Sequence, residues 1–122
     1  MNSIQYKYID LQSIKDDTFG DVEILRMIIA LFIEGIDEYV DTLNNELPNQ
    51  NWHELFKATH KIKPNISMFG ITKLVPTILD MESNFKNAQN LDSVDALVSF
   101  SIPVFRQVKI ELQNELKLMP NE

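Results

Sequence analysis

The sequence contains no cysteine. Disulfide bonds, thiol chemistry and tetrahedral thiolate zinc sites are therefore excluded. Long hydrophobic runs are missing as well, because the longest apolar-rich stretch, residues 27–33, is far shorter than the roughly 20 residues that span a bilayer. The first ten residues have no apolar core and do not predict a signal peptide. We expect a cytoplasmic protein that does not use the membrane as a partner.

Basic residues are outnumbered by acidic ones, eleven against eighteen, which gives a formal net charge of −7. Nucleic acids and anionic membranes both require a positive footprint on the protein, so neither is an expected partner. None of the three glycines lies in a Gly-rich phosphate loop, and no other nucleotide-binding motif is present. The chain is therefore not expected to be an enzyme with a kinase or phosphatase centre of its own.

Helical periodicity is the main signal that the sequence does contain. Apolar residues over 22–43 recur in alternating steps of three and four, which is typical of a long helix packed in a left-handed bundle. Asp21 is placed to cap this helix. A second helix is predicted from the cap residue Asn51 to Gly70.

Two further helices follow in the pattern, and one short helix precedes it. The third helix is predicted to start near Thr72, and residues 87–90 are predicted to form a loop. Asp92 or Ser93 is the predicted cap of the last helix, and Pro103 should kink that helix. Asp10 and the apolar residues after it suggest a short N-terminal helix. Four main helices with short links predict an all-α, antiparallel up-down-up-down four-helix bundle with a short extra N-terminal helix, forming one domain over residues 1–122.

His60 has an unusual position on the second helix. Successive residues of an α-helix turn by about 100°, which places His60 about 110° from the centre of the apolar face, so its ring should reach water. Lys57 and Lys63 are its neighbours three residues away on either side. Their ammonium groups disfavour a further positive charge on the ring and are suited to holding phosphoryl oxygens. Pro64 leaves a compact ring, rather than a long side chain, one turn beyond His60.

The stretch from Ala58 to Gly70, ATHKIKPNISMFG, resembles the phosphorylation-site helix of histidine-containing phosphotransfer (HPt) domains. That family's pattern is a histidine followed by an apolar residue two positions on, a lysine three on, a small residue, usually glycine, four on, and a glycine ten on. His60, Ile62, Lys63 and Gly70 match the pattern, and Pro64 departs from it.

The resemblance implies that His60 is the phosphoacceptor, that Lys63 supports the phosphoryl group with Lys57 as a further candidate, and that Gly70 ends the helix and allows close packing. It also implies a function as a phosphocarrier, with the receiver domains of hybrid histidine kinases and response regulators as partners. The receiver domain would supply the aspartate and Mg²⁺, so no cofactor or metal is assigned to this chain. A stand-alone monomer is the expected form.

Docking of a partner requires an apolar patch near the histidine. Met27 and Leu31 lie roughly 100° or more off the inward face of the first long helix and are the candidates, together with Pro64 and Ser67. The alternative is that the first helix simply buries a wider face.

Two other functions compete with the phosphocarrier. A metal site that combines His53 and His60 with Glu54 or Glu82 is disfavoured, because helical metal ligands usually lie three or four residues apart. The stronger rival is a non-catalytic helical adaptor that uses the same bundle and the same patch, with an inert His60.

Overall fold

The computed structural model describes residues 5–120, and within them it contains helices and no strands. The elements in chain order are α1 (Gln12–Asp17), α2 (Val22–Glu46), α3 (Trp52–Met68), the 3₁₀ turn η1 (Thr72–Leu74), α4 (Val75–Asn87) and α5 (Leu91–Leu118). The predicted all-α class is confirmed. The ends of the predicted 1–122 domain lie outside the described residues.

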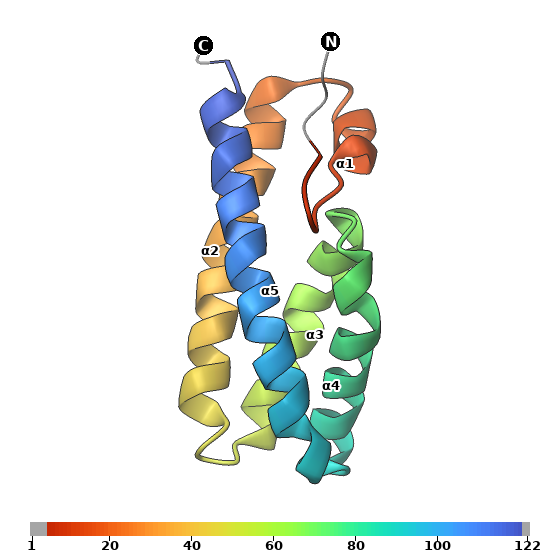
Figure 1. Cartoon of the computed structure of the whole chain (residues 1–122), viewed down its shortest axis with the longest axis vertical. Coiled ribbons are helices and arrows are strands. Elements are labelled where there is room, and N and C mark those ends of the chain that lie inside the picture. The colour runs from red at the N-terminus through yellow and green to blue at the C-terminus, as the bar shows by residue number, and fades with distance from the viewer. Residues whose placement is uncertain (1–4, 121–122) are drawn as a thin grey trace.

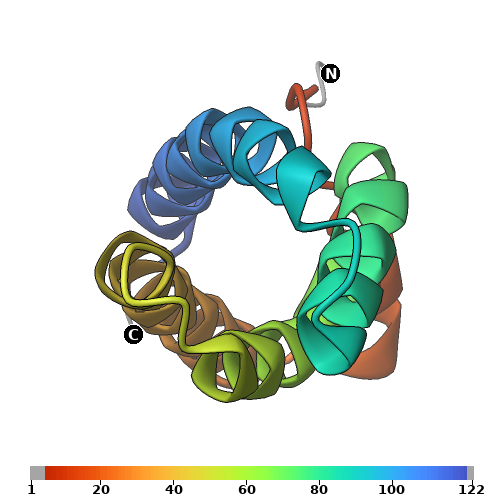
Figure 2. The same cartoon turned by 90° about the horizontal axis from the view of Figure 1, so that it is seen from below.

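The four long helices are arranged in a ring around one core. Each packs on two neighbours, since α2 and α4 both contact α3 and α5. Figure 1 shows α2, α3, α4 and α5 running in alternating directions, with α1 at the end of the bundle where α2 begins. Figure 2, viewed along the bundle, shows the ring of four helices in chain order. The exposed side of α3 is therefore bordered by α2 on one flank and by α4 on the other.

The helix α2 follows its sequence pattern closely. The side chains that recur at steps of three and four are buried, and they include Ile29, Phe32 and Tyr39. The carboxylate of Asp21 accepts a hydrogen bond of 3.1 Å from the backbone N–H of Ile24, which confirms the predicted cap.

Two other predicted caps are not made by side chains. Asn51 does occupy the N-cap position of α3, but its side chain makes no capping hydrogen bond. The prediction that Asp92 or Ser93 caps the last helix is wrong, because α5 already begins at Leu91 after Asn90. Asn90 adopts a left-handed conformation with φ 53°, which asparagine tolerates better than most residues. The helix therefore begins two or three residues earlier than predicted.

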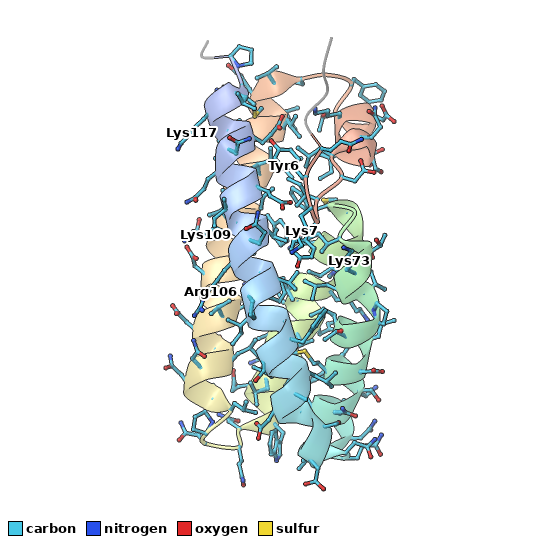
Figure 3. The ribbon with its side chains drawn as sticks, in the orientation of Figure 1. Tyr6, Lys7, Lys73, Arg106, Lys109 and Lys117 are labelled. Carbon is cyan, nitrogen blue, oxygen red and sulfur yellow. The ribbon has the colours of Figure 1, made fainter. Side chains whose placement is uncertain are left out.

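The N-terminal segment is bound along α5 by one buried carboxylate. Glu111 is 4% exposed and accepts hydrogen bonds of 3.1 Å from the backbone N–H groups of Lys7, Tyr8 and Ile9. Figure 3 shows Tyr6 and Lys7 lying between α5 and the segment that carries Lys73. These three hydrogen bonds satisfy a buried carboxylate that would otherwise lack partners in the interior.

The same segment continues to the end of α3. The backbone N–H of Asp10 donates a 2.9 Å hydrogen bond to the carbonyl of Phe69. Gly70 has φ +67°, and a Cβ atom there would lie 2.7 Å from Cβ of Asp10. Only glycine combines this conformation with such a close approach, so Gly70 ends α3 and admits the N-terminal segment.

Candidate functional site

His60 lies near the middle of α3 with its side chain 64% exposed. This agrees with the position predicted from the helical periodicity. The imidazole stacks on Phe56, one turn earlier, with ring centroids 5.7 Å apart and an interplanar angle of 27°. The preceding residue, Thr59, is fully buried and hydrogen-bonded to Tyr39 of α2 at 2.7 Å. One face of the ring is thus supported while its edge is open to solvent.

The nearest charged group to His60 is a carboxylate on the neighbouring helix α4. Oε2 of Glu82 lies 2.6 Å from Nδ1 of His60, and Oε1 of the same carboxylate accepts a 2.8 Å hydrogen bond from Nζ of Lys63. Partial burial of Glu82 raises its pKa, but the hydrogen bonds and positive charges of Lys63 and His60 outweigh that effect. The pKa of Glu82 therefore lies below its ordinary value, and the group is a carboxylate at neutral pH.

This contact determines which nitrogen of the imidazole is available. An ionised carboxylate can only accept hydrogen bonds, so Nδ1 of His60 must carry the proton that lies between the two residues. In the neutral ring, the lone pair is then on Nε2. Because the side chain is largely exposed, Nε2 is the nitrogen that can attack an incoming electrophile.

The lysines are arranged differently from the sequence expectation. Lys63 does lie at the site, but as the second partner of Glu82. Lys57 is paired with Glu54 at 3.4 Å, one turn earlier on α3. The sequence analysis considered only the charged neighbours of His60 on the same helix, and it therefore did not include the Glu82 carboxylate, which comes from α4.

His60 lines a surface pocket of about 390 Å³ together with residues of α3 and α4. The α4 side of this pocket is lined by Glu82, Ser83, Lys86 and Asn87. The sequence analysis gave Glu82 no role beside His60 other than that of a possible metal ligand, and it missed the other three residues. The available signal was the spacing of Glu82 and Lys86, four residues apart, which places both on one face of a helix.

Two of the predicted docking residues lie on α3 beyond His60. Pro64 and Ser67 are exposed and line a second pocket with residues of α4. The structure therefore places them on the same flank of α3 as Glu82.

The other two predicted docking residues lie on α2, further from the histidine. Met27 and Leu31 are 62% and 60% exposed, so α2 does not bury the wider face that was the alternative. The hydrogen bond between Tyr39 of α2 and Thr59 of α3 shows that Tyr39 lies at about the same height along the bundle as His60. Leu31 precedes Tyr39 by eight residues, which is about 12 Å along the helix, and Met27 is about 18 Å away. The structure does not bring these two residues next to His60.

Within residues 5–120, no group of three or more His, Asp or Glu side chains is positioned to hold a metal ion. In the same part of the chain, no helix is both long enough and apolar enough to cross a bilayer.

The geometry presents one exposed histidine with its Nδ1 held by a carboxylate and cationic side chains beside it. The model of the Hpt domain family matches residues 27–121 of the chain. This chain belongs to the Hpt domain family. Comparison with curated proteins and with solved structures gave no match. Hpt domains are phosphocarrier modules that function in phosphorelays, where they interact with receiver domains and have no catalytic centre of their own. The family match begins at Met27, so the N-terminal segment and α1 lie outside it.

Proposed function

We propose that this Hpt domain relays a phosphoryl group between receiver-domain aspartates through a phosphohistidine on His60. The receiver domains would be those of hybrid histidine kinases and response regulators. The observation that carries the proposal is the 2.6 Å contact between Nδ1 of His60 and Glu82, which directs the lone pair of the neutral ring to Nε2, on an exposed side chain.

In the forward step, the Nε2 lone pair attacks the phosphorus of an aspartyl phosphate on the partner. The P–N bond forms as the P–O bond to the aspartate breaks in line, and the aspartate leaves as a carboxylate. No proton needs to leave the ring, because Nδ1 keeps its hydrogen bond to Glu82. The ring becomes positively charged in the process, and the Glu82 carboxylate stabilises that charge, as an aspartate does for the histidine of a catalytic triad. The reverse step transfers the group to the next aspartate and restores the neutral ring.

The cations that line the site would stabilise the transferred group. Lys63 and Lys86 come from opposite sides of the pocket around His60. Charge-assisted hydrogen bonds from ammonium groups to phosphoryl oxygens are about twice as strong as neutral ones. Mg²⁺ and the reacting aspartate belong to the partner receiver domain in this proposal, and the chain itself requires no cofactor.

The partner would cover the surface around His60. A transient interface that buries about 600 Å² on each partner corresponds to a disc of about 14 Å radius. Pro64 and Ser67, within two turns of His60, lie inside such a disc, and Leu31 lies at its edge. Met27 would be reached by a larger interface. We propose Pro64, Ser67 and Leu31 as docking residues, with Met27 at the periphery.

The direct test is to incubate the protein with a phosphorylated receiver domain and Mg²⁺ and to measure label that is acid-labile and alkali-stable. The variant His60→Gln should take no label. The variant His53→Gln is the matched control, because it removes the other histidine of α3, and it should be labelled like the wild type. Label that survives in His60→Gln would assign the phosphoacceptor to another residue.

The adaptor alternative predicts a different result. Its support is the exposure of Met27 and Leu31 on α2, which suits a binding surface without chemistry. An adaptor would bind its partner equally well with His60 or with the His60→Gln substitution, and neither protein would be labelled by any receiver domain tested.

A further inference from the structure

A second pocket lies beside His60 in the groove between α3 and α4. Its volume is about 300 Å³. The residues that line it are Lys63, Pro64, Ile66, Ser67, Val75, Ile78 and Leu79. Lys63 also lines the pocket around His60, so the two pockets adjoin.

The residues that line this pocket are mostly apolar, and the charged residue among them is paired with a carboxylate. Buried Ile66 and Ile78 are both 1% exposed and lie at its base, whereas Leu79 is 48% exposed at its rim. The one charged residue in the lining, Lys63, already has an ion pair with Glu82 at 2.8 Å. A charged side chain entering the pocket would lose hydration without gaining a free counter-charge, whereas an apolar one would bury surface on both partners.

The position of the pocket relates it to phosphotransfer. Pro64 follows His60 by four residues on α3, and Leu79 precedes Glu82 by three residues on α4, so the pocket lies about one helical turn, or about 5 Å, from the histidine. A receiver domain that brings an aspartyl phosphate to about 3–3.5 Å from Nε2 and covers a disc of about 14 Å radius around His60 would also cover this pocket.

We propose that the pocket between α3 and α4 receives one medium-sized apolar side chain, such as leucine, isoleucine or methionine, from the surface of the receiver domain next to its phosphorylated aspartate. This inference rests on the proposed function. The pocket would anchor the partner, and the fit of that side chain would help to select among receiver domains, because a polar or charged residue at the same place would be desolvated without compensation.

The test measures phosphotransfer from a panel of phosphorylated receiver domains as a function of receiver concentration. The variant Leu79→Lys places a charge on the rim of the pocket, and Ser67→Lys does the same from the α3 side. With a receiver domain that labels the wild type, each should raise KM about ten-fold, whereas the rate at saturation should change little, since His60 and Glu82 are untouched. Ile110→Lys is the matched control, because Ile110 is a similarly exposed apolar residue, 56% exposed, on α5. Its KM should equal that of the wild type.

The outcomes distinguish a failure of the pocket inference from a failure of the proposed function. If the wild type is labelled and the KM values of Leu79→Lys and Ser67→Lys equal that of Ile110→Lys, the pocket is not an anchor, but the phosphocarrier function stands. A lower rate at saturation with an unchanged KM would show an effect on the reacting groups and would also overturn the inference. If no receiver domain labels the wild type, the proposed function fails, and the inference fails with it.

Discussion

Oε2 of Glu82 lies 2.6 Å from Nδ1 of His60, although the two residues are 22 positions apart in the chain and lie on different helices. Lys63 holds the other oxygen of the same carboxylate at 2.8 Å. Lys63 thus orients the Glu82 carboxylate, and the carboxylate in turn orients the His60 imidazole. This arrangement of three residues makes His60 differ from an ordinary surface histidine.

Substitutions of Glu82 should separate its two effects on His60. In Glu82→Gln the amide oxygen can still accept from Nδ1, so the tautomer is kept and only the negative charge is lost. In Glu82→Ala both the hydrogen-bond acceptor that keeps the tautomer and the negative charge are lost. A hydrogen bond to a charged group contributes about 1.5–3 kcal/mol, so we expect transfer to slow about ten-fold in Glu82→Gln and about a hundred-fold in Glu82→Ala. Single-turnover transfer from a phosphorylated receiver domain measures both. Wild-type rates in Glu82→Ala would remove Glu82 from the mechanism.

The ion pairs of Glu82 should make the stability of the fold depend on pH. The folded state lowers the pKa of Glu82 below the ordinary value of 4.5. Its contribution to the free energy of unfolding is therefore complete above about pH 4.5 and is lost as the pH falls through the lower, folded-state pKa. Urea unfolding of the wild type and of Glu82→Gln between pH 7 and pH 3 measures this. The wild type should be more stable at pH 7, and the difference should shrink at the acidic end. A difference that grows on acidification would contradict the assignment.

The two lysines on either flank of the His60 pocket should matter more than Lys57. Lys86→Ala removes a cation that lines this pocket and should slow transfer about three- to ten-fold. Lys63→Ala also frees the Glu82 carboxylate and should have a larger effect. Lys57→Ala is the control, because that side chain is exposed and paired with Glu54. It should stay within about two-fold of the wild type, since exposed ion pairs contribute little. Equal rates for Lys57→Ala and Lys86→Ala would contradict the arrangement.

Gly70 should be far less tolerant of alanine than Gly35. Alanine at position 70 would have to adopt a left-handed conformation and place its Cβ 2.7 Å from Cβ of Asp10. The conformational cost is about 1–2 kcal/mol and that of overpacking about 1–3 kcal/mol. We expect the free energy of unfolding to fall by about 2–5 kcal/mol, measured by urea denaturation. Gly35 is within α2 and has open space around its Cβ position. Gly35→Ala should be neutral or stabilising by up to about 1 kcal/mol.

The helices of this protein could be predicted from the sequence because amphipathic periodicity is a local property. The steps of three and four over residues 22–43 specify which side of α2 is buried, and the capping carboxylate of Asp21 acts within one turn. The exposure of His60 followed from the same geometry. The start of α5 was missed, because a left-handed Asn90 competes with the side-chain caps that were expected at Asp92 and Ser93.

The environment of His60 was decided by the tertiary structure alone. Lys57, Lys63 and Glu82 were all visible in the sequence, but their distances from the imidazole depend on the relative height and rotation of α3 and α4. Packing of α4 against α3 brings Glu82 to Nδ1 of His60 and adds Lys86 to the pocket, while Lys57 pairs with Glu54 instead. Helical periodicity was enough to predict that a histidine would be exposed on a helical bundle. Only the packing of two helices decided which nitrogen of that histidine carries the proton and which charges surround it, because electrostatic contacts of this kind change with shifts of a few ångströms that no local pattern specifies.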